Sequence, residues 1–442
     1  MSIQDKPLDG VTVVDAASLY AGPLTAMMLG DFGADVIKVE HPEAGDALRE
    51  FGDGDESLSW KWVNRNKKSV PLDLHTEEGQ RLFRELVADA DVLVENFRPG
   101  TLEEWNVGWE TLSDENPGLV MVRTTGFGQT GPYSDRPGFG TLVEAMSGFA
   151  YSTGQPDGPP TLPPVAMADS ICALHSAYAA MMALYWRDVN GGTGQYIDSA
   201  ILENMFGLLG DHVVEYDQKG TDHRRSGNRS SRTSPRNTYR TADDRWVAIS
   251  GSAPSIADRI LRIVGGDDLA EDPRFQTMEG RLEHADELDE VIADWMADHT
   301  REEVVEIFEE NEAAIGPVNN MADIFEDPHF EERDAIVTVE DGDDELSMRG
   351  VFPKFSETPG EVEHAGPGLG EHAVDVLTEY TDRSPDEIRD LAEAGVTTVG
   401  DESAAGTDGS ATGTDENATA DDESDGPAAD ENAAATGGEV DD

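Results

Sequence analysis

Basic residues are scarce in this chain, and their scarcity is the first constraint on its function. Its 442 residues include 31 Lys and Arg but 92 Asp and Glu, which gives a formal net charge of −61. Such a negative chain is repelled by phosphate backbones and by anionic lipid headgroups. Nucleic-acid and membrane partners are therefore not expected.

The acidic residues are spread along the chain instead of gathering in one segment, and only seven of the basic residues are Lys. A carboxylate-rich, Lys-poor surface is typical of a cytosol with molar salt, where the Debye length shrinks to about 3 Å and self-repulsion is screened. A cation-binding acidic surface is the alternative, and the even spread of charge disfavours it.

Cysteine and long apolar runs are also nearly absent. Cys172 is the one cysteine, so no internal disulfide can form. The sequence has no apolar run of about 18 residues, and Met1–Gly10 has no charged-then-apolar leader, so neither a membrane span nor export is predicted. We expect a cytoplasmic protein.

What is present is an alternation of short apolar runs with helical patterns. Pro164–Arg187, rich in Ala and Met, predicts one long buried helix. The alternation predicts an α/β fold with a mostly parallel sheet covered on both faces. Strands are predicted at Val11–Asp15, Asp35–Glu40, Asp91–Glu95, Leu119–Thr125 and Gln195–Ser199.

The composition changes near residue 219, where a long polar, Arg-rich stretch begins. We expect a large α/β domain from residues 1–218, a smaller domain with its linkers at 219–330, and a return to the large domain at 331–398. Residues 399–442 are too polar to bury a core and predict a disordered acidic tail.

Gly126-Phe-Gly128-Gln-Thr-Gly131 has the spelling of a dinucleotide-binding loop and follows a predicted strand. That fingerprint also requires a helix to open at the loop, so that its N-terminus can bind a pyrophosphate. Two prolines and a glycine follow here instead, in Pro132–Gly138. A glycine-rich loop lining a cleft is the better interpretation.

Asp169 is the most informative single residue, because it lies near the start of an otherwise apolar helix. It either complements the helix dipole or serves as a carboxylate nucleophile in a partly apolar cleft. Cys172 has no basic neighbour that would activate it, so an inert buried thiol is expected. His175 falls on another face of the helix, and no paired Cys or H-E-x-x-H motif predicts a metal.

Because cations are so few, their positions carry weight. Lys38, Arg49, Lys67, Lys68 and Arg98 fall near predicted strand ends or turns. Ligands of open α/β sheets bind outside the carboxyl ends of the strands, so these cations suit a polyanionic ligand such as a phosphorylated nucleotide. Isolated ion pairs on an acidic protein are the alternative.

Several short motifs, in this order, resemble the family III coenzyme A transferases over about residues 8–394. None is specific alone, but their order is. They are Val13–Asp15, Ala21–Pro23, Phe32–Glu40, Asn66–Ser69, Val94–Gly100, Gly126–Pro132, Gly194–Asp198, Gly316–Val318 and Leu369–His372.

The resemblance implies an interlocked homodimer, each chain with a Rossmann-like large domain and a smaller α+β domain. It implies that Asp169 is the nucleophile, forming an aspartyl mixed anhydride and then an aspartyl–CoA thioester. CoA thioesters are substrates, and no permanently bound cofactor or metal is implied. The implied CoA contacts are Leu19, Tyr20, Lys38, His41, Leu72, Asn96, Phe97, Arg98, Gly138, Phe139 and Gly140.

The sequence departs from parts of the family at these contacts. His41 stands where an Arg is common, and Glu104 and Pro137 replace basic residues of the formyl-CoA branch. Phosphate binding is therefore expected to depend on other cations, such as Lys38 or Arg98.

Arg136–Met146 and Ser234–Arg240 look more like the dicarboxylate branch, in which Arg236 suits a second carboxylate. With the acidic composition, this favours a haloarchaeal enzyme that transfers CoA from succinyl-CoA to a dicarboxylate such as mesaconate. An intramolecular mesaconyl-CoA C1–C4 transferase, a CoA-thioester hydrolase and a CoA-binding regulatory protein are alternatives. A 2-methylacyl-CoA racemase is another, although Phe139-Gly140 replace its His-Asp pair.

Overall fold

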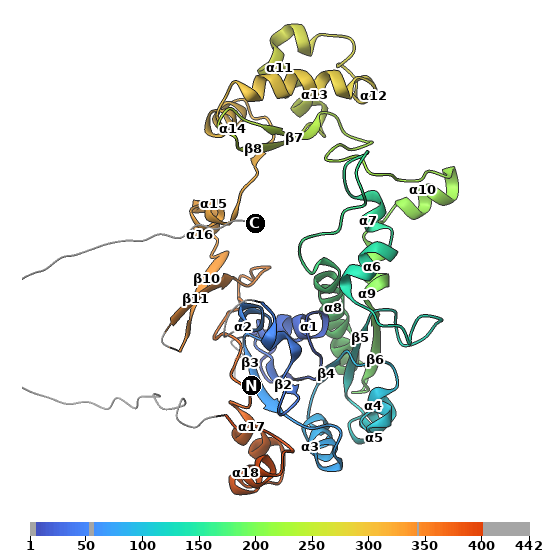
Figure 1. Ribbon diagram of the computed structural model, residues 1–442, viewed down its shortest axis with the longest axis vertical. Helices are drawn as coiled ribbons and strands as arrows, with labels where there is room; N and C mark the ends of the chain where they lie inside the picture. The colour runs from blue at the N-terminus through green and yellow to red at the C-terminus, as the bar shows by residue number, and fades with distance from the viewer. Residues whose placement is uncertain (1–5, 53–56, 343, 401–442) are drawn as a thin grey trace, which may run out of the picture. The chain divides into compact units, whose positions relative to one another are not determined.

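The computed structural model describes residues 6–52, 57–342 and 344–400 (Figure 1). Of the expected acidic tail at 399–442, everything from residue 401 onward lies outside the described residues.

The larger part of the described structure is built around a six-stranded sheet that is parallel throughout (Figure 1). Its strand order is β3-β2-β1-β4-β5-β6, the order of a doubly wound Rossmann-like fold. The expected α/β class is therefore confirmed. The strands are β1 (Thr12–Asp15), β2 (Asp35–Glu40), β3 (Lys67–Pro71), β4 (Val92–Glu95), β5 (Val120–Thr125) and β6 (Gln195–Ala200).

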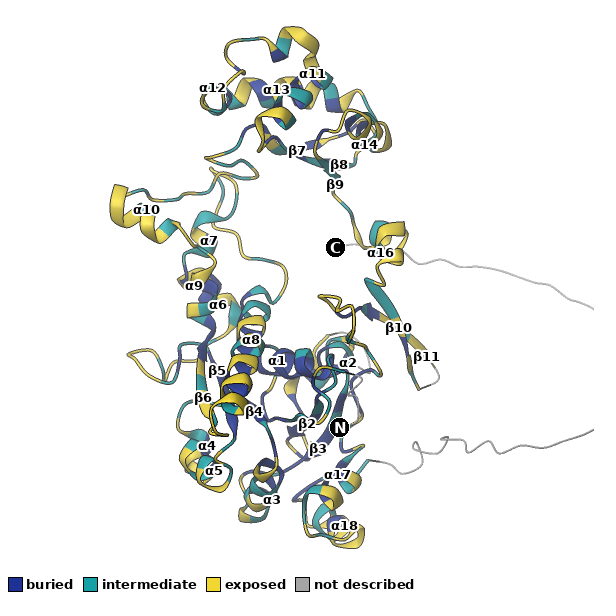
Figure 2. Ribbon diagram, turned by 180° about the vertical axis from the view of Figure 1, so that it is seen from behind, coloured by how far each residue is buried: buried dark blue, intermediate teal, exposed yellow. Residues whose placement is uncertain are grey.

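Successive residues of a strand point to opposite faces of the sheet, and in the inner strands each face contributes to a separate buried core. Val13 belongs to a core that includes Ala26 of α1 and Ala180 of α8, whereas Val14 belongs to a core that includes Leu82 of α3. Figure 2 shows α1 and the inner strands of the sheet as largely buried, whereas the edge strand β6 is partly exposed. The helices of this part are α1 (Ala21–Gly30), α2 (Leu58–Val63), α3 (Glu77–Ala88), α4 (Thr101–Glu104), α5 (Trp109–Glu115), α6 (Gly140–Met146), α7 (Phe149–Ser152), α8 (Met167–Val189), α9 (Ile201–Gly207) and α10 (His212–Lys219), with a 3-10 turn η1 (Ala47–Glu50).

The end of the described chain returns to this core. Val376 and Leu377 of α17 (Ala373–Tyr380) and Ile388 of α18 (Pro385–Glu393) are buried with the strand residues of the Val14 side. Both ends of the described chain therefore complete one core.

A separate antiparallel sheet of order β7-β8-β9 has a core of its own, which includes Val247, Ile260 and Phe308. Another hairpin, β10-β11, lies between this region and α17 in the sequence. The elements are β7 (Arg236–Arg240), β8 (Trp246–Ser250), α11 (Pro254–Ala270), α12 (Met278–Glu283), α13 (Ala285–Ala297), α14 (Arg301–Glu310), β9 (Ile315–Pro317), α15 (Met321–Phe325), α16 (Pro328–Glu332), β10 (Ile336–Asp341) and β11 (Asp344–Arg349).

Helix α8 differs from its prediction as a buried helix. One of its faces packs on the sheet through Ala180 and Leu184. A second face leaves large apolar side chains exposed, with Tyr185 at 70% and Trp186 at 55% of their full exposure. Apolar residues lie all around this helix, so its sequence does not show which face packs on the sheet and which face stays exposed.

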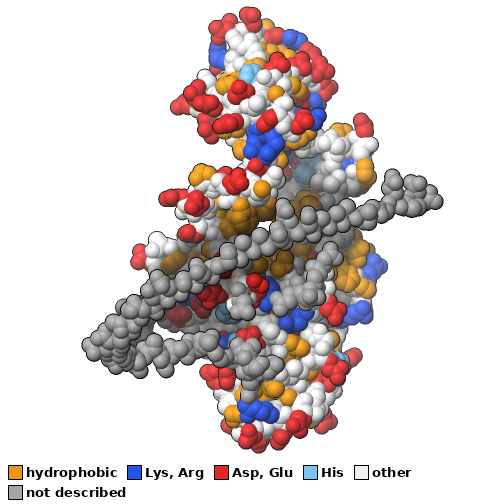
Figure 3. All heavy atoms as spheres, turned by 60° about the vertical axis from the view of Figure 1, so that its left-hand side comes forward, with side chains coloured by type: hydrophobic (Ala, Val, Ile, Leu, Met, Phe, Trp, Pro, Cys, Tyr) orange, Lys and Arg blue, Asp and Glu red, His pale blue; other side chains and the backbone are white. Residues whose placement is uncertain are grey.

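The surface is acidic over a wide area. On the face drawn in Figure 3, Asp and Glu side chains are scattered and do not form a single cluster. Among the described residues, no helix combines the length and the hydropathy needed to cross a lipid bilayer. The preference for molar salt stays a prediction.

A fully buried ion network connects the first three strands. The Nζ of Lys67, at the start of β3, lies 2.8 Å from Asp15 Oδ2 at the end of β1. The Nζ of Lys38, on β2, lies 2.9 Å from Asp46 Oδ2 and 4.0 Å from Asp15 Oδ2. Burial lowers the pKa of Lys67 to about 8 despite the carboxylate of Asp15. For Lys38, burial acts in the same direction, but Asp15 and Asp46 outweigh it and raise the pKa.

Asp15→Ala is expected to lower the free energy of unfolding by about 3–5 kcal/mol, because it leaves two buried ammonium groups short of a carboxylate. Asp35→Ala is the matched control, since Asp35 forms a 2.8 Å pair with the half-exposed Lys68 and should cost less than about 1 kcal/mol. Urea denaturation in high KCl measures both. Equal losses in the two variants would contradict the network's role.

Candidate active site

Two cavities lie at the carboxyl ends of the strands, on either side of the turn that follows β1. In a sheet of this order the strand order reverses between β1 and β4, and ligands bind in the crevice that opens at this switch point. Both cavities include Ser18 and Phe97 in their walls, so they adjoin one another.

The first, here called the His41 cavity, is mostly apolar. Its aromatic side chains are neighbours: the ring of Trp105 lies 5.2 Å from Phe97 and 4.9 Å from His75, and His75 lies 6.3 Å from His41. Its walls are Ala16, Ala17, Ser18, Lys38, Val39, Glu40, His41, Gly45, Asp46, Leu72, Leu74, His75, Phe97 and Trp105.

The second, here called the Asp169 cavity, has a volume of about 270 Å³ and contains the candidate nucleophile. Residues from the turns after β1, β4 and β5 meet there with the first turn of α8. They are Ser18, Leu19, Tyr20, Ala21, Asn96, Phe97, Arg98, Pro99, Thr124, Thr125, Gly126, Ser134, Arg136, Pro137, Gly138, Phe139, Asp169 and Ile201.

Asp169 is the third residue of α8 and packs against Gly140, the first residue of α6. A Cβ at position 140 would lie 2.3 Å from Asp169 Oδ2, closer than any real contact. A side chain at this position would therefore force the Asp169 carboxylate out of its present orientation. The absence of a side chain at Gly140 positions Asp169 at the cavity wall.

A second carboxylate, that of Glu144, lies beneath Asp169. It is buried on α6, and its Oε1 accepts a 3.2 Å hydrogen bond from the N–H of Ala168 in the first turn of α8. Helix α8 has no side-chain cap from its own N-cap residue, Ala166. Glu144 therefore satisfies one of the N–H groups that a helix start leaves without a partner.

These surroundings raise the pKa of Asp169 to about 6, first through burial and second through the negative charge of Glu144. Asp169 is consequently ionised near neutral pH but is a better nucleophile than an ordinary aspartate, since basicity and nucleophilicity rise together. This agrees with the interpretation of Asp169 as a reactive carboxylate.

The turn from Ala16 to Tyr20 forms part of the wall of both cavities and is held in an unusual conformation. Leu19 has a φ of 65°, in the left-handed region that costs energy for a side chain of this size. Its N–H donates to Asp46 Oδ1 at 3.1 Å. Asn96 holds Ser18 from the other side, accepting from its N–H at 2.8 Å and donating to its carbonyl oxygen at 2.7 Å.

The expected role of Lys38 as a phosphate-binding cation needs correction. Its side chain is fully buried, and its Nζ is bound by Asp46 and by the carbonyl oxygen of Ala17. Because its ammonium is already paired, Lys38 supports the turn after β1 instead of offering a free charge. Arg49 is likewise paired, with its Nε 2.7 Å from Glu40 Oε2.

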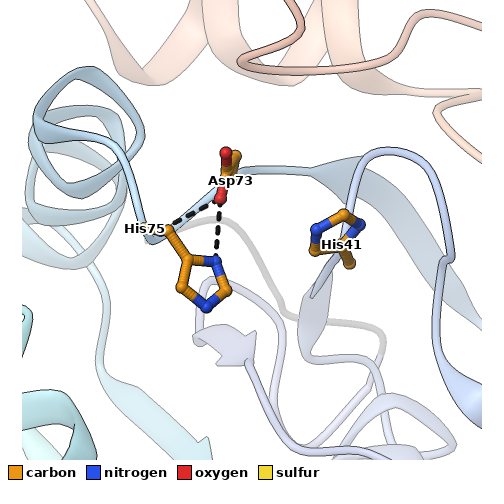
Figure 4. A group of neighbouring side chains, drawn as sticks. All are labelled: His41, Asp73 and His75. Carbon is orange, nitrogen blue, oxygen red and sulfur yellow. Dashed lines mark hydrogen bonds and ion pairs between the residues drawn. The ribbon is translucent and has the colours of Figure 1, made fainter.

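His41, Asp73 and His75 bring two imidazoles and a carboxylate together at the rim of the His41 cavity (Figure 4). Their nearest possible ligand atoms lie within 4.8 Å of one another. The chain already uses part of this set: His75 Nδ1 is 3.0 Å from Asp73 Oδ1, and His41 Nδ1 accepts from the N–H groups of Glu43 and Ala44 at 3.2 Å. The residue types could ligate a metal, but these bonds account for their present arrangement.

Cys172 and His175 do not join Asp169 in a nucleophilic set. Cys172 is fully buried, and burial raises the pKa of its thiol. His175 Nδ1 lies 2.7 Å from Asn204 Oδ1. Cys172 is thus buried, as the sequence indicated, and its lack of reactivity stays a prediction.

The structure gathers the expected site residues. Gly140 packs on Asp169, and the other eleven line one cavity or both. Arg236, expected to meet a second carboxylate, lines neither cavity in this chain and donates to the carbonyl oxygen of Arg229. Glu144 and Trp105 were missed, although a lone acid inside the apolar run Leu142–Met146 was a usable signal.

A doubly wound sheet with adjoining cavities at its switch point is typical of an α/β enzyme that binds its substrate at the carboxyl ends of the strands. Residues 8–373 match the model for CoA-transferase family III. The chain belongs to this family and is a CoA-transferase.

Named relatives and a solved structure agree with this assignment. The chain is 42% identical over 387 residues to a succinyl-CoA–D-citramalate CoA-transferase of Chloroflexus aurantiacus, covering 87% of this chain and 96% of the relative. It is 35% identical over 385 residues to the succinyl-CoA:mesaconate CoA-transferase of Haloarcula hispanica, covering 84% and 96%. A CAIB/BAIF family protein from Brucella suis superposes with a TM-score of 0.77 at 33% identity, covering 85% and 100%.

Glu144→Gln is expected to move the acid limb of the pH–rate profile to lower pH. A carboxylate attacks in its ionised form, so the rate should fall as the pH drops through about 6, the pKa of Asp169. Gln keeps an acceptor for the Ala168 N–H but removes the charge that raises this pKa. The transfer rate between pH 4.5 and 8 measures the shift. Glu110→Gln, an exposed acid on α5, is the charge control; an unmoved acid limb in Glu144→Gln would contradict the coupling.

Proposed function

We propose that this enzyme transfers CoA from succinyl-CoA to a short dicarboxylate, with Asp169 as the covalent nucleophile. The observation that carries this proposal is the placement of Asp169: a carboxylate with a pKa of about 6, held against Gly140 at the wall of a cavity. A nucleophile with tuned basicity in a confined site is what acyl transfer requires.

In the first half of the reaction, an Asp169 oxygen attacks the carbonyl carbon of succinyl-CoA and the C–S bond breaks. The products are a succinyl–aspartyl anhydride and CoA thiolate. The thiolate then attacks the aspartyl carbonyl and releases succinate, leaving an aspartyl–CoA thioester. The acceptor carboxylate reverses these two steps, first displacing the thiolate from Asp169 and then receiving it, so that Asp169 is regenerated.

The CoA nucleotide is assigned to the His41 cavity and the thioester to the Asp169 cavity. The neighbouring rings of Phe97, Trp105 and His75 offer faces and edges against which a purine can pack. The shared wall at Ser18 and Phe97 lets the pantetheine arm pass between the cavities. Arg98 is the candidate for a phosphate contact, because it directly follows Phe97, which lines both cavities.

Mesaconate and citramalate are the proposed acceptors. Relatives named for each acid align over most of this chain, and identity is higher to the citramalate enzyme. Intramolecular transfer within mesaconyl-CoA would use the same aspartyl chemistry. A racemase is disfavoured because Phe139 provides no acid or base for the α-carbon.

Asp169→Asn should lower transfer by at least roughly 10³-fold, because the amide cannot form the anhydride. In the native enzyme, hydroxylamine added with succinyl-CoA but no acceptor should convert Asp169 to a hydroxamate, found by mass spectrometry of its peptide. CoA affinity measured by calorimetry should be retained in Asp169→Asn.

The same preparation separates the alternatives. Loss of thioester without any adduct would identify a hydrolase, and CoA binding without turnover would identify a regulatory protein. Isomerisation of mesaconyl-CoA alone would identify the intramolecular reaction. A panel of mesaconate, citramalate, malate and monocarboxylates then ranks the acceptors.

We also propose that the enzyme is a homodimer in which a second copy covers the exposed apolar face of α8. A continuous patch of exposed apolar side chains on a folded chain marks an interaction surface. The spacing of these side chains places them along one stripe of the helix. They are Leu174, Tyr178, Met181, Met182, Tyr185, Trp186 and Val189.

Light scattering should give twice the chain mass of 47.7 kDa for the native protein. Tyr178→Glu combined with Tyr185→Glu should lower this to a single chain or to a mixture of the two states, because the charges cannot be desolvated at the interface. Tyr185→Phe, which keeps an apolar ring, is the control. A native mass of one chain would refute the dimer.

A further inference from the structure

Two arginine residues line the Asp169 cavity, in a chain that has only 31 Lys and Arg among 442 residues. Arg98 and Arg136 both line it. Within residues 6–52, 57–342 and 344–400, neither forms an ion pair with a carboxylate, although the chain holds 92 acidic side chains. Cations that stay unpaired here are available to an anionic ligand.

Arg136 is oriented by stacking. Its Cζ lies 3.8 Å from the ring centroid of Tyr133, whose ring lies 5.8 Å from that of Phe127. Stacking uses the flat face of a guanidinium and leaves its N–H edges free for a planar, bidentate partner. A carboxylate is such a partner.

The loop that carries Arg136 is fixed at its base. A Cβ on Gly126 would lie 2.5 Å from Cα of Gly138, so the backbones on the two sides of the loop touch. The carboxylate of Asp198 accepts a hydrogen bond from the N–H of Gln129 at 3.0 Å and so holds the part of the loop that follows β5. Arg136, two residues before Gly138, is therefore held close to the wall that contains Asp169.

Reach distinguishes the possible anions. In a succinyl thioester only two methylene groups separate the reacting carbonyl from the second carboxylate. The nearest phosphate of CoA lies at the far end of the much longer pantetheine arm. When the carbonyl is at Asp169, a cation in the same small cavity can meet the second carboxylate, whereas the nucleotide extends toward the His41 cavity.

We propose that Arg136 binds the second carboxylate of the acyl group and of the acceptor, and so determines the preference for dicarboxylates. This rests on the proposed transferase function. The contact fixes the distant end of the acid, which places its reacting carbon against Asp169.

The test compares succinyl-CoA with butyryl-CoA, which lacks the second carboxylate, in the hydroxylamine-trapped half reaction at high KCl. Arg136→Gln should lower kcat/KM for succinyl-CoA about thirty- to a hundredfold, as expected for a lost hydrogen bond to a charged group. Butyryl-CoA should change less than about threefold. Arg136→Lys should restore part of the loss, since it restores the charge.

Arg333→Gln, at an exposed position after α16, makes the same change in net charge outside both cavities and is the control. Equal losses for the two thioesters would assign Arg136 to CoA itself and overturn the proposal, and so would no loss for either. Native enzyme that forms no hydroxamate with succinyl-CoA refutes the transferase function instead, so the two failures are distinguishable.

Discussion

The structure depends on charges that are removed from water beneath the binding turn. Lys67, Asp15, Lys38 and Asp46 connect three parallel strands to the segment that follows β1. The same Asp46 accepts the N–H of Leu19 and so stabilises a strained backbone conformation. Separating these charges is costly in a low-dielectric interior, and therefore the turn that forms part of both cavity walls keeps one conformation.

Around Asp169 the chain uses absence as much as presence. Because Gly140 has no side chain, the carboxylate of Asp169 can approach α6. The carboxylate of Glu144 lies close to the first turn of α8 and adds a second negative charge near Asp169. A resting carboxylate next to another carboxylate is destabilised, and this repulsion is relieved once Asp169 carries an acyl group. The arrangement would favour an acylated Asp169 relative to the free carboxylate, which suits the proposed route through two covalent intermediates.

The fold class and the position of Asp169 could be predicted from the sequence. Apolar runs such as Asp35–Glu40 identified five strands of the parallel sheet, whereas β3 (Lys67–Pro71), which begins with two lysines, was missed. Asp169 was conspicuous as an acid at the start of an apolar helix. The partners of these residues could not be predicted, because pairing depends on contacts across the fold. Lys38 seemed free for a phosphate until the sheet placed it between two aspartates, and Glu144 lies 24 residues before its hydrogen-bond partner Ala168.

The contact between Gly126 and Gly138 has a consequence for how this family diversifies. The backbones of Gly126 and Gly138 touch, so the residues between them form a loop that is closed at its base. The length and side chains of this loop can change without moving β5 or α6. Substitutions in this loop can therefore change the part of the cavity wall around Arg136 while Asp169 keeps its place. One scaffold can thus acquire new acids as substrates through mutations confined to a single short insertion point.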